Sequence, residues 1–542
     1  MDLLPRSDVP TSLCDHCDHA LEHVRYDLDS AMSALRHNYS PEGADIDEII
    51  LTMAAIDCHF EVYDPEISRL QSILASLQMQ KARLQWYQEC CRSVIAPIRK
   101  LPSEILETIF LACASPQPNV IPVVGQVCRH WRDVAESTPQ LWSNISIGRT
   151  RFTFSQRYYD LASLFLKRST TRPLSISIRN PADTRLVSLL FGHADRWGTL
   201  RLSSTDKSTY NSLPLHNRAL PMLEKLEIIE PTTGPNEGDP VKILHNAPNL
   251  KYVVLKNPLD FWDLPWAQLT RLQYDVAATT DAIRILRLCP HLEECALDKL
   301  KEAYAADLDG SPIQPLRMRK LRSLRLAVDT VNPTHSVELM MKTFFDNLTT
   351  PCLTSLEIIG QWSPTDFMGF LARSACKLTH LTLGPGYMRD DKIIDVLQIV
   401  PSLNALVLDA DIGTSRQIQN RAITDKLLRR LVFYPDSDCM LPSLTHFSLK
   451  TNLNFEDQAL LDVIESRWVP WVTELYGVRV ARLARVDLEF YGKKVKLGTE
   501  SVGELKELAE AGLRITLQQG PEKISMFSSD EDENEESSAY VI

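Results

Sequence analysis

The chain has 542 residues and a net charge of −12, with 44% hydrophobic and 24% charged residues, which is globular composition in a chain too long for one hydrophobic core. It contains no block of basic residues and no run of 18 apolar residues, so we expect no nucleic-acid partner and no membrane span. The 12 dispersed cysteines and the absence of a secretory signal predict a reducing compartment, cytoplasmic and/or nuclear.

Residues 1–44 are predicted to form a flexible acidic N-terminal segment, because they carry many acids and no apolar periodicity. This segment contains four potential zinc ligands within six residues: Cys14, His16, Cys17 and His19. Structural zinc sites separate two ligand pairs by a loop, and this spacing leaves no room for one. We therefore predict no metal and no cofactor, with a structural zinc site as the alternative.

Residues 45–97 are predicted to be helical. One apolar stripe contains Ile46, Ile49, Ile50, Met53 and Ile56, and Pro65 is expected to interrupt it. A short heptad seam follows at Ile67, Leu70, Leu74, Leu77, Lys81 and Leu84. Two interpretations stay open: a helical hairpin packed on the next domain, or a dimerising coiled coil.

Residues 98–147 are predicted to form a small unit of two amphipathic helices. Pro102 opens the first helix, whose apolar face carries Ile105, Leu106, Ile109 and Phe110. The second helix is expected to run as one element to Thr138-Pro139, with the following apolar residues on one side: Val123, Val124, Val127, Cys128, Trp131, Val134 and Ala135. Two short helices bury little apolar surface, so this unit requires a packing partner.

The region 150–520 repeats a pattern of a leucine, two variable residues, an apolar residue, one variable residue and a second apolar residue. The first positions are 19 to 41 residues apart, with helix-like segments between them. The triplets are Trp197-Leu200-Leu202, Leu223-Leu226-Ile228, Leu250-Val253-Leu255, Leu269-Leu272-Tyr274, Leu292-Cys295-Leu297, Leu321-Leu324-Leu326, Leu353-Leu356-Ile358, Leu378-Leu381-Leu383, Leu403-Leu406-Leu408 and Leu444-Phe447-Leu449.

This pattern predicts an irregular α/β leucine-rich-repeat-like solenoid, in which each unit contributes a short strand and stacks on its neighbours. The asparagine typical of such repeats occurs only at Asn452, so we expect irregular turns. An α/β domain with coincidental triplets is the alternative. Near the end, residues 455–468 are predicted to be helical, 482–492 to be a last strand, and 502–518 to be a capping helix and strand.

Residues 521–542 are predicted to be a disordered acidic tail, because six acids and no base follow Ser528. Ser528 and Ser529 precede these acids, which makes them possible phosphorylation sites, with a merely solubilising tail as the alternative. The chain shows no phosphate-binding glycine loop, zinc-protease motif or nucleophile elbow, so we predict that it is not an enzyme.

The two helices of residues 98–147 resemble the F-box of the large fungal family of F-box proteins. Leu-Pro-x-Glu-Ile-Leu, Val-Cys-Arg-x-Trp and Leu-Trp-x-x-Ile stand in family order at 101–106, 127–131 and 141–145. Three prolines, Pro116, Pro118 and Pro122, replace the usual leucine-rich middle, so the second helix is expected to start late. The resemblance implies that the following residues bind a Skp-type adaptor: Leu101, Pro102, Ile105, Leu106, Ile109, Val127, Cys128, Trp131 and Trp142.

The resemblance also implies a function. The protein would be the substrate-recognition subunit of an SCF-type cullin-RING ubiquitin ligase, holding an unknown protein substrate on the repeats without catalytic residues of its own. The alternatives are an interaction scaffold outside a ligase, an enzyme with a cryptic site, and a coiled-coil scaffold that only dimerises. Two tryptophan pairs, Trp262 with Trp266 and Trp468 with Trp471, are possible binding hot spots, although a structural role is favoured.

Overall fold

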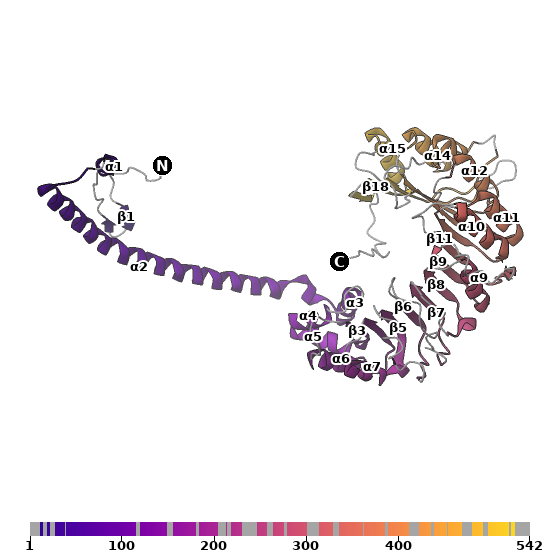
Figure 1. The fold of residues 1–542 in the computed structure, drawn as a ribbon, viewed down its shortest axis with the longest axis horizontal. Helices are drawn as coiled ribbons and strands as arrows, with labels where there is room; N and C mark the ends of the chain where they lie inside the picture. Colours follow the sequence, from indigo (N-terminus) through magenta and orange to yellow (C-terminus); the bar gives the residue numbers. More distant parts are fainter. Residues whose placement is uncertain are drawn as a thin grey trace. The chain divides into compact units, whose positions relative to one another are not determined.

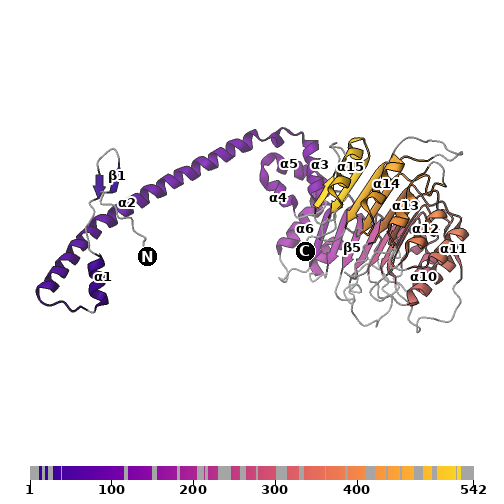
Figure 2. The same ribbon diagram turned by 90° about the horizontal axis from the view of Figure 1, so that it is seen from above.

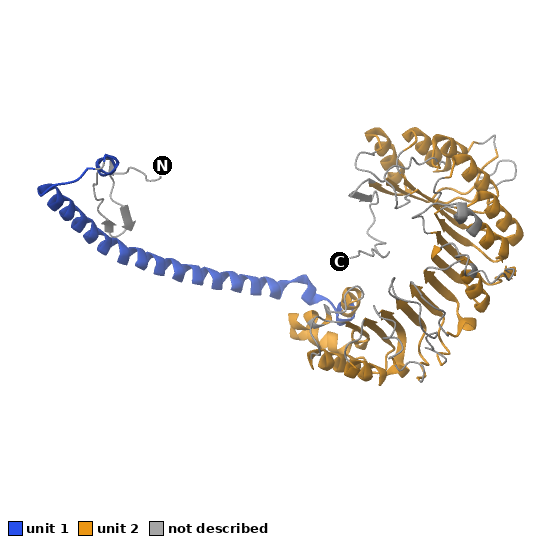
Figure 3. Cartoon of the chain, viewed as in Figure 1, with its two compact units in different colours: residues 1–106 blue, residues 107–542 orange. Residues whose placement is uncertain are grey.

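The computed structural model describes most of the chain. The described residues are 11–14, 19–21, 28–37, 39–114, 120–148, 156–179, 184–203, 213, 218–229, 246–256, 264–275, 279–300, 314–328, 335–360, 362–384, 388–410, 422–434, 438–451, 454–468, 480–490, 497–519 and 522–525. They fall into two compact units, residues 1–106 and 107–542 (Figure 3). A helical N-terminal region is thus followed by a strand-rich region with a parallel sheet, which confirms the mixed α/β class.

The first unit contains a short antiparallel pair of strands, β1 (Thr11–Cys14) and β2 (His19–Leu21), followed by helix α1 (Leu28–Arg36). Of the four potential zinc ligands, His16 and Cys17 lie outside the described residues. The long helix α2 (Ala44–Ile95) and a 3₁₀ turn, η1 (Pro97–Lys100), complete the unit.

Helix α2 runs through Pro65 without a break for 52 residues, and none of its residues is buried. The predicted interruption at Pro65, and with it the helical hairpin, is therefore wrong. A proline removes one helix hydrogen bond, but its fixed φ is a helical value, so the chain can resume the helix within the next turn. The ten residues after Pro65 include only good or moderate helix formers, which favours that outcome.

Helix α3 (Ser103–Ala114) begins just after Pro102, as predicted, and spans the division between the units. The single second helix is wrong, because the structure has two: α4 (Val120–Val127) and α5 (Arg129–Ser137). Cys128 separates them with an extended backbone, and its sulfur accepts a hydrogen bond from the Trp131 amide at 3.5 Å, so it caps α5. The 3₁₀ turn η2 (Pro139–Trp142) follows.

A 15-stranded sheet dominates the second unit, and its strands are neighbours in chain order. All adjacent pairs are parallel except the last, β18 with β19. The strands are β3 (Asn144–Gly148), β4 (Leu174–Arg179), β5 (Trp197–Ser203), β6 (Lys225–Ile229), β7 (Tyr252–Lys256), β8 (Arg271–Asp275), β9 (Glu294–Leu300), β11 (Ser323–Val328), β13 (Ser355–Ile359), β14 (His380–Gly384), β15 (Ala405–Asp409), β16 (His446–Thr451), β17 (Arg485–Phe490), β18 (Arg514–Gln519) and β19 (Glu522–Ser525).

Helices return along one face of this sheet, and the strands line the other face (Figures 1 and 2). The helices are α6 (Gln156–Arg168), α7 (Thr184–Phe191), α9 (Thr279–Leu288), α10 (His335–Asn347), α11 (Pro364–Ser374), α12 (Asp390–Gln398), α13 (Asp425–Leu431), α14 (Asp457–Trp468) and α15 (Thr499–Glu510). Two further 3₁₀ turns, η3 (Ala194–Arg196) and η4 (Trp266–Gln268), and a short parallel pair, β10 (Leu316–Arg317) with β12 (Leu348–Thr349), lie between these elements.

The core consists of two rows of apolar side chains that cross the sheet in register. The second triplet positions align from strand to strand, as Leu200 with Leu226 and Leu356 with Leu381, and the third positions align likewise. These side chains are almost completely buried against the helices. Ile145 and Ile176 extend the row to β3 and β4, which none of the predicted triplets covers.

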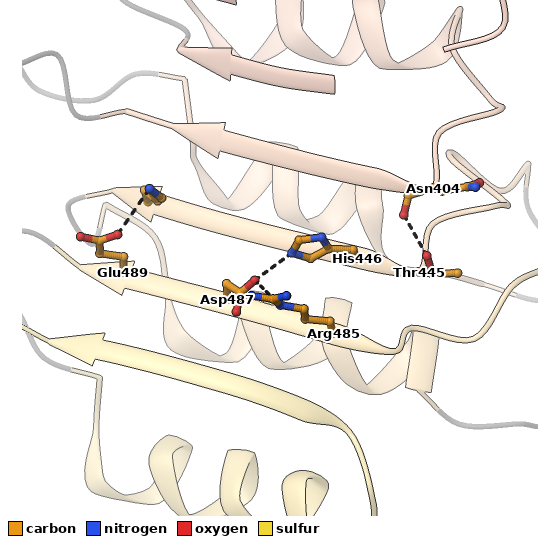
Figure 4. A network of polar contacts seen from close by, with 7 residues as sticks. Asn404, Thr445, His446, Arg485, Asp487 and Glu489 are labelled. Atoms are coloured by element: carbon orange, nitrogen blue, oxygen red, sulfur yellow. Dashed lines mark hydrogen bonds and ion pairs between the residues drawn. The ribbon is translucent and has the colours of Figure 1, made fainter. Parts of the chain in front are cut away.

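A recurring backbone contact joins neighbouring repeats where each strand begins. One carbonyl accepts two amide hydrogen bonds from the next repeat, as Thr354 O does from Thr379 and His380, and Asn404 O from Thr445 and His446. The Thr445 hydroxyl also donates to Asn404 O at 3.1 Å (Figure 4). Because unpaired backbone groups are costly, these contacts stabilise the pairing of neighbouring repeats at the starts of the strands.

The last elements agree with the sequence predictions. Helix α14 matches the predicted helix at 455–468, and β17, α15 and β18 match the predicted last strand and capping helix and strand. Arg467 ties this end together, since its buried guanidinium donates to the carbonyls of Leu431, Met440 and Leu441 at 2.8, 2.5 and 3.1 Å. Burial lowers the pKa of Arg467, and these three acceptors compensate for the lost hydration.

Candidate functional site

The first candidate surface is the start of helix α3. Pro102 O accepts the amide hydrogen bonds of Ile105 and Leu106, both at 3.1 Å, which sets the first turn. The Ile105 side chain is 48% exposed, whereas Leu106 is completely buried. Pro102 is exposed and Leu101 half-buried. The helix therefore presents an apolar side chain to solvent next to one that serves the core.

The second candidate surface is helix α4. Its buried side is formed by Ile121 and Val124, while Val123 and Val127 are 60% and 57% exposed. Residues four apart lie on the same face of a helix, so Val123 and Val127 form an apolar patch on α4. The Arg132 guanidinium donates to Gly125 O at 2.8 Å and ties α5 to this helix.

The aromatic residues of this region support the fold. Trp131 is half-buried and lies 5.1 Å from the Phe110 ring, measured between centroids. Trp142 is 4% exposed, donates from Nε1 to Ala135 O at 2.7 Å, and packs edge-on against Phe165 of α6 at 4.9 Å. Arg168, also on α6, covers the other side of Trp142 at 4.4 Å and pairs with Glu136 at 2.7 Å.

The packing of Trp142 identifies the partner that these short helices require: α6 and the start of the sheet. The nine predicted contact residues consequently divide by exposure. Pro102, Ile105 and Val127 are exposed, and Leu106 and Trp142 are buried. The remaining four, Leu101, Ile109, Cys128 and Trp131, are half-buried. Val123 was absent from the predicted set, although its spacing from Val127 was a usable signal.

The third candidate surface is the sheet face opposite the helices, which we call the inner face. It carries the strand residues that alternate with the buried rows, such as Lys225 and Glu227 on β6. Ion pairs cross it between strands: Arg201–Glu227 at 3.5 Å, Arg271–Glu294 at 3.2 Å, Arg325–Asp298 at 3.4 Å, Arg325–Glu357 at 3.6 Å and Lys450–Glu489 at 3.6 Å. This face therefore suits a charged or polar partner. The variable positions inside the triplets were the sequence signal for it.

One polar network lies on strands β16 and β17 (Figure 4). Asp487 lies 2.8 Å from His446 Nε2 and accepts a hydrogen bond from Arg485 Nε at 2.8 Å. Burial acts to raise the pKa of Asp487, but the His446 hydrogen bond and the Arg485 charge together hold it below its usual value. This arrangement keeps Asp487 ionised and orders the three side chains.

Another cluster lies on β8 and β9, where Asp275 and Asp298 are register partners. Burial, and secondarily the Asp298 charge, raises the pKa of Asp275, although Lys299 at 3.7 Å and Lys256 oppose the shift. Asp275 Oδ1 has no hydrogen-bond partner among the described residues. Keeping Asp275 ionised therefore lowers the free energy of unfolding.

Replacing Asp275 with asparagine is expected to raise the free energy of unfolding at pH 7. A carboxyl with a raised folded-state pKa binds its proton more tightly when folded, so the wild type loses stability as pH rises through that pKa. The asparagine variant lacks this loss, and its advantage should vanish toward pH 4. Denaturant unfolding across this pH range measures the effect, with the exposed Glu294→Gln as the control. An equal, pH-independent change in both variants would contradict it.

Two of the described cysteines belong to the buried core. Cys289 and Cys295 are buried, and burial raises the pKa of Cys289 to about 12 and also raises that of Cys295. Such thiols stay protonated and unreactive, as expected for packing residues. No three potential metal ligands lie together within the described ranges.

The structure describes one residue from each of the two tryptophan pairs that were predicted as possible binding hot spots. Trp266 is 9% exposed, and the Arg482 guanidinium covers the Trp468 ring at 3.4 Å, so both side chains are structural. Their predicted companions, Trp262 and Trp471, lie outside the described residues, as do Asn452 and the possible phosphorylation sites Ser528 and Ser529.

Comparison with known families identifies an F-box-like domain at residues 98–148. This confirms the F-box predicted from the sequence motifs. The match covers helices α3, α4 and α5 and ends with strand β3, which is already the first strand of the large sheet. A search of curated proteins finds no relative. In the part of the chain that the structure describes, no helix is both long and apolar enough to cross a membrane.

Proposed function

We propose that this protein is a substrate-recognition subunit of an SCF-type cullin-RING ubiquitin ligase. The F-box-like match at residues 98–148 carries the proposal, because F-box domains are adaptor-binding modules. Pro102, Ile105, Val123 and Val127 support it, since each leaves an exposed side chain in that domain. These residues bind a Skp-type adaptor, while Leu106 and Trp142 hold the domain together.

The strand-rich region is a leucine-rich-repeat-like solenoid that holds the protein substrate. In-register strands, returning helices and the repeated backbone contact between neighbours support this part of the proposal. The inner face, with its crossing ion pairs, is the substrate-binding surface. The ligase then acts by position, because it brings ubiquitin and a substrate lysine together without a catalytic residue of this chain.

An interaction scaffold that binds the adaptor outside a ligase is the second candidate, because the F-box-like match supports adaptor binding and does not by itself require a cullin. In either role the protein would act in the cytoplasm and/or nucleus. The motif resemblance supports a fungal origin, and the heptad pattern of α2 supports a coiled coil.

Co-purification of the full chain with purified Skp-type adaptor and cullin tests the proposal. Both should be retained, and a reconstituted ligase should ubiquitinate proteins that bind the repeats. A chain that binds the adaptor but never recruits cullin would support the scaffold, and one that binds neither would overturn both proposals. Ile105→Asp, which changes an exposed side chain, provides the matched negative sample.

A further inference from the structure

Helix α2 carries an apolar surface that no described part of the protein covers. All 52 of its residues are at least partly exposed. Long helices in water gain most of their stability from packing of an apolar face rather than from intrinsic propensity. Residues 67–89 are exposed without exception, including Ile67, Leu70, Leu74 and Leu77. This helix therefore requires a partner that packs against its apolar residues.

The continuity of α2 through Pro65 joins the two predicted stripes into one heptad frame. In that frame the a positions are Ile46, Met53, Phe60, Ile67, Leu74, Lys81, Gln88 and Ile95, and the d positions are Ile49, Ile56, Tyr63, Leu70, Leu77, Leu84 and Cys91. Only Lys81 and Gln88 are polar. Pro65 falls at an f position, on the side of the helix away from the seam, so it does not disturb the packing of the a and d side chains. A seam of about seven heptads follows, far longer than the sequence alone indicated.

We infer that α2 pairs with α2 of a second copy of this chain as a parallel, in-register, two-stranded coiled coil. β-Branched residues at a with leucine at d favour two parallel strands, and Ile67 with Leu70 and Leu77 follows that preference, whereas Ile46 at a with Ile49 at d is typical of three strands. The two-stranded state therefore rests on the later heptads of α2 and on the polar a positions. A groove lined by Leu77, Gln80, Lys81, Leu84, Gln85 and Gln88 lies on this seam. Its members occupy a, d, e and g positions, the set that forms the holes of a coiled coil.

The flanking charges suit a second copy in this alignment. In a parallel pair each g residue faces the e residue five positions later in the other chain. The resulting pairs are Asp45–Ile50, Thr52–Asp57, His59–Asp64, Glu66–Gln71, Ile73–Gln78, Gln80–Gln85 and Tyr87–Arg92. None of these g–e pairs joins like charges, and the only like charges that the frame brings together are the two Lys81 side chains in their shared a layer.

The two polar a positions favour the parallel direction. In parallel register Lys81 and Gln88 each share a layer with their own copy, and a single polar a layer is known to select register and strand number. In an antiparallel pair of full overlap, Lys81 would lie in a layer with Ile56 or Tyr63. Each polar residue of each chain would then lie in a layer of its own, so the same polar residues would disrupt twice as many layers as in the parallel pair. Parallel pairing makes the two chains leave the coiled coil at the same end, so both F-box-like domains of a dimer follow that end.

Sedimentation equilibrium of the full-length protein tests the pairing. Twice the chain mass of 61.4 kDa is expected. Leu77→Asp should raise the dimer dissociation constant by about 30-fold or more, because it places a charge at a d position. Met79→Asp is the matched control, since Met79 is 63% exposed against 57% for Leu77 but lies at f. A monomeric wild type, a trimer, or equal effects of both variants would overturn the inference; a monomer would mean that another protein covers α2.

Cys91 tests the direction. A parallel register places the two Cys91 side chains in one d layer, whereas an antiparallel pair separates them by most of the helix. Disulfides form where Cα atoms come within about 4.4–6.8 Å. Oxidised glutathione should therefore convert the two thiols to one disulfide, itself being reduced to two thiols, and yield a covalent dimer on non-reducing gels. Cys91→Ser should abolish this product and the neighbouring Cys90→Ser, at c, should not. No Cys91-dependent covalent dimer would overturn parallel pairing, and a dimer that depends on Cys90 alone would overturn the assignment of Cys91 to d. Neither experiment contains an adaptor, so both are independent of the proposed ligase function.

Discussion

Replacing Ile105 with aspartate is expected to weaken binding of the Skp-type adaptor by about 30-fold or more, the effect of losing one apolar hot spot of about 2 kcal/mol. The Ile105 side chain is 48% exposed, so a charge there meets water in the free protein and enters an apolar contact only in the complex. Calorimetric titration of the full chain with purified adaptor measures the change.

Leu288→Asp is the matched control for this variant. Leu288 is 45% exposed on α9, outside the F-box-like domain, so the same chemical change should leave adaptor affinity unaltered. Unchanged binding by Ile105→Asp would refute the assignment of α3 as a contact. A variant that changes Ile105 and Leu106 together is not a substitute for the single change. Because Leu106 is completely buried, that double variant would unfold the domain and report nothing about the adaptor.

Trp142→Ala is expected to lower the free energy of unfolding by about 3–5 kcal/mol, the usual cost of truncating a buried aromatic residue. The change removes the contact with Phe165, the Arg168 stacking and the hydrogen bond to Ala135 O. Because these partners include α6, the loss should loosen the junction between the F-box-like domain and the sheet. Chemical denaturation monitored by circular dichroism measures it.

Trp142→Phe separates the contributions at this site. Phenylalanine retains much of the ring packing but not the N–H donor, so the expected loss is smaller, about 1–3 kcal/mol for the unsatisfied Ala135 carbonyl together with the smaller ring. Adaptor affinity measured below the unfolding transition should match the wild type in both variants. A loss of affinity without a loss of stability would show that Trp142 contacts the adaptor after all.

Much of the fold could be predicted because its signals are local. The triplets at Leu223, Leu353 and Leu403 mark strands directly, since inward side chains of a short strand must alternate. The F-box motif at residues 101–106 was equally direct. The strand β3 escaped the triplet search although Trp142 precedes Ile145 at the spacing at which Trp197 precedes Leu200, and β4 escaped because a proline, Pro173, stands at its opening position. The division at Cys128 escaped because a helical period continues in the sequence across a residue whose backbone is extended.

The site was less predictable, because exposure depends on packing between distant segments. Leu106 and Ile105 are neighbours of similar apolar character, yet one is buried and the other is half exposed. Trp142 was predicted to contact the adaptor, but helix α6, which begins 14 residues later, covers it. The inner-face pairs, such as Arg325 with Glu357, join residues far apart in the chain.

The sequence by itself therefore determined the F-box-like domain, the repeating strands and the apolar stripes of α2, because each is written in the spacing of nearby residues. Only the tertiary structure decided which apolar residues face solvent, which charges meet on the inner face, and that one helix passes through Pro65. The physical reason is that burial and ion pairing depend on which surfaces meet in space. Periodicity specifies a face, and packing decides what lies against it.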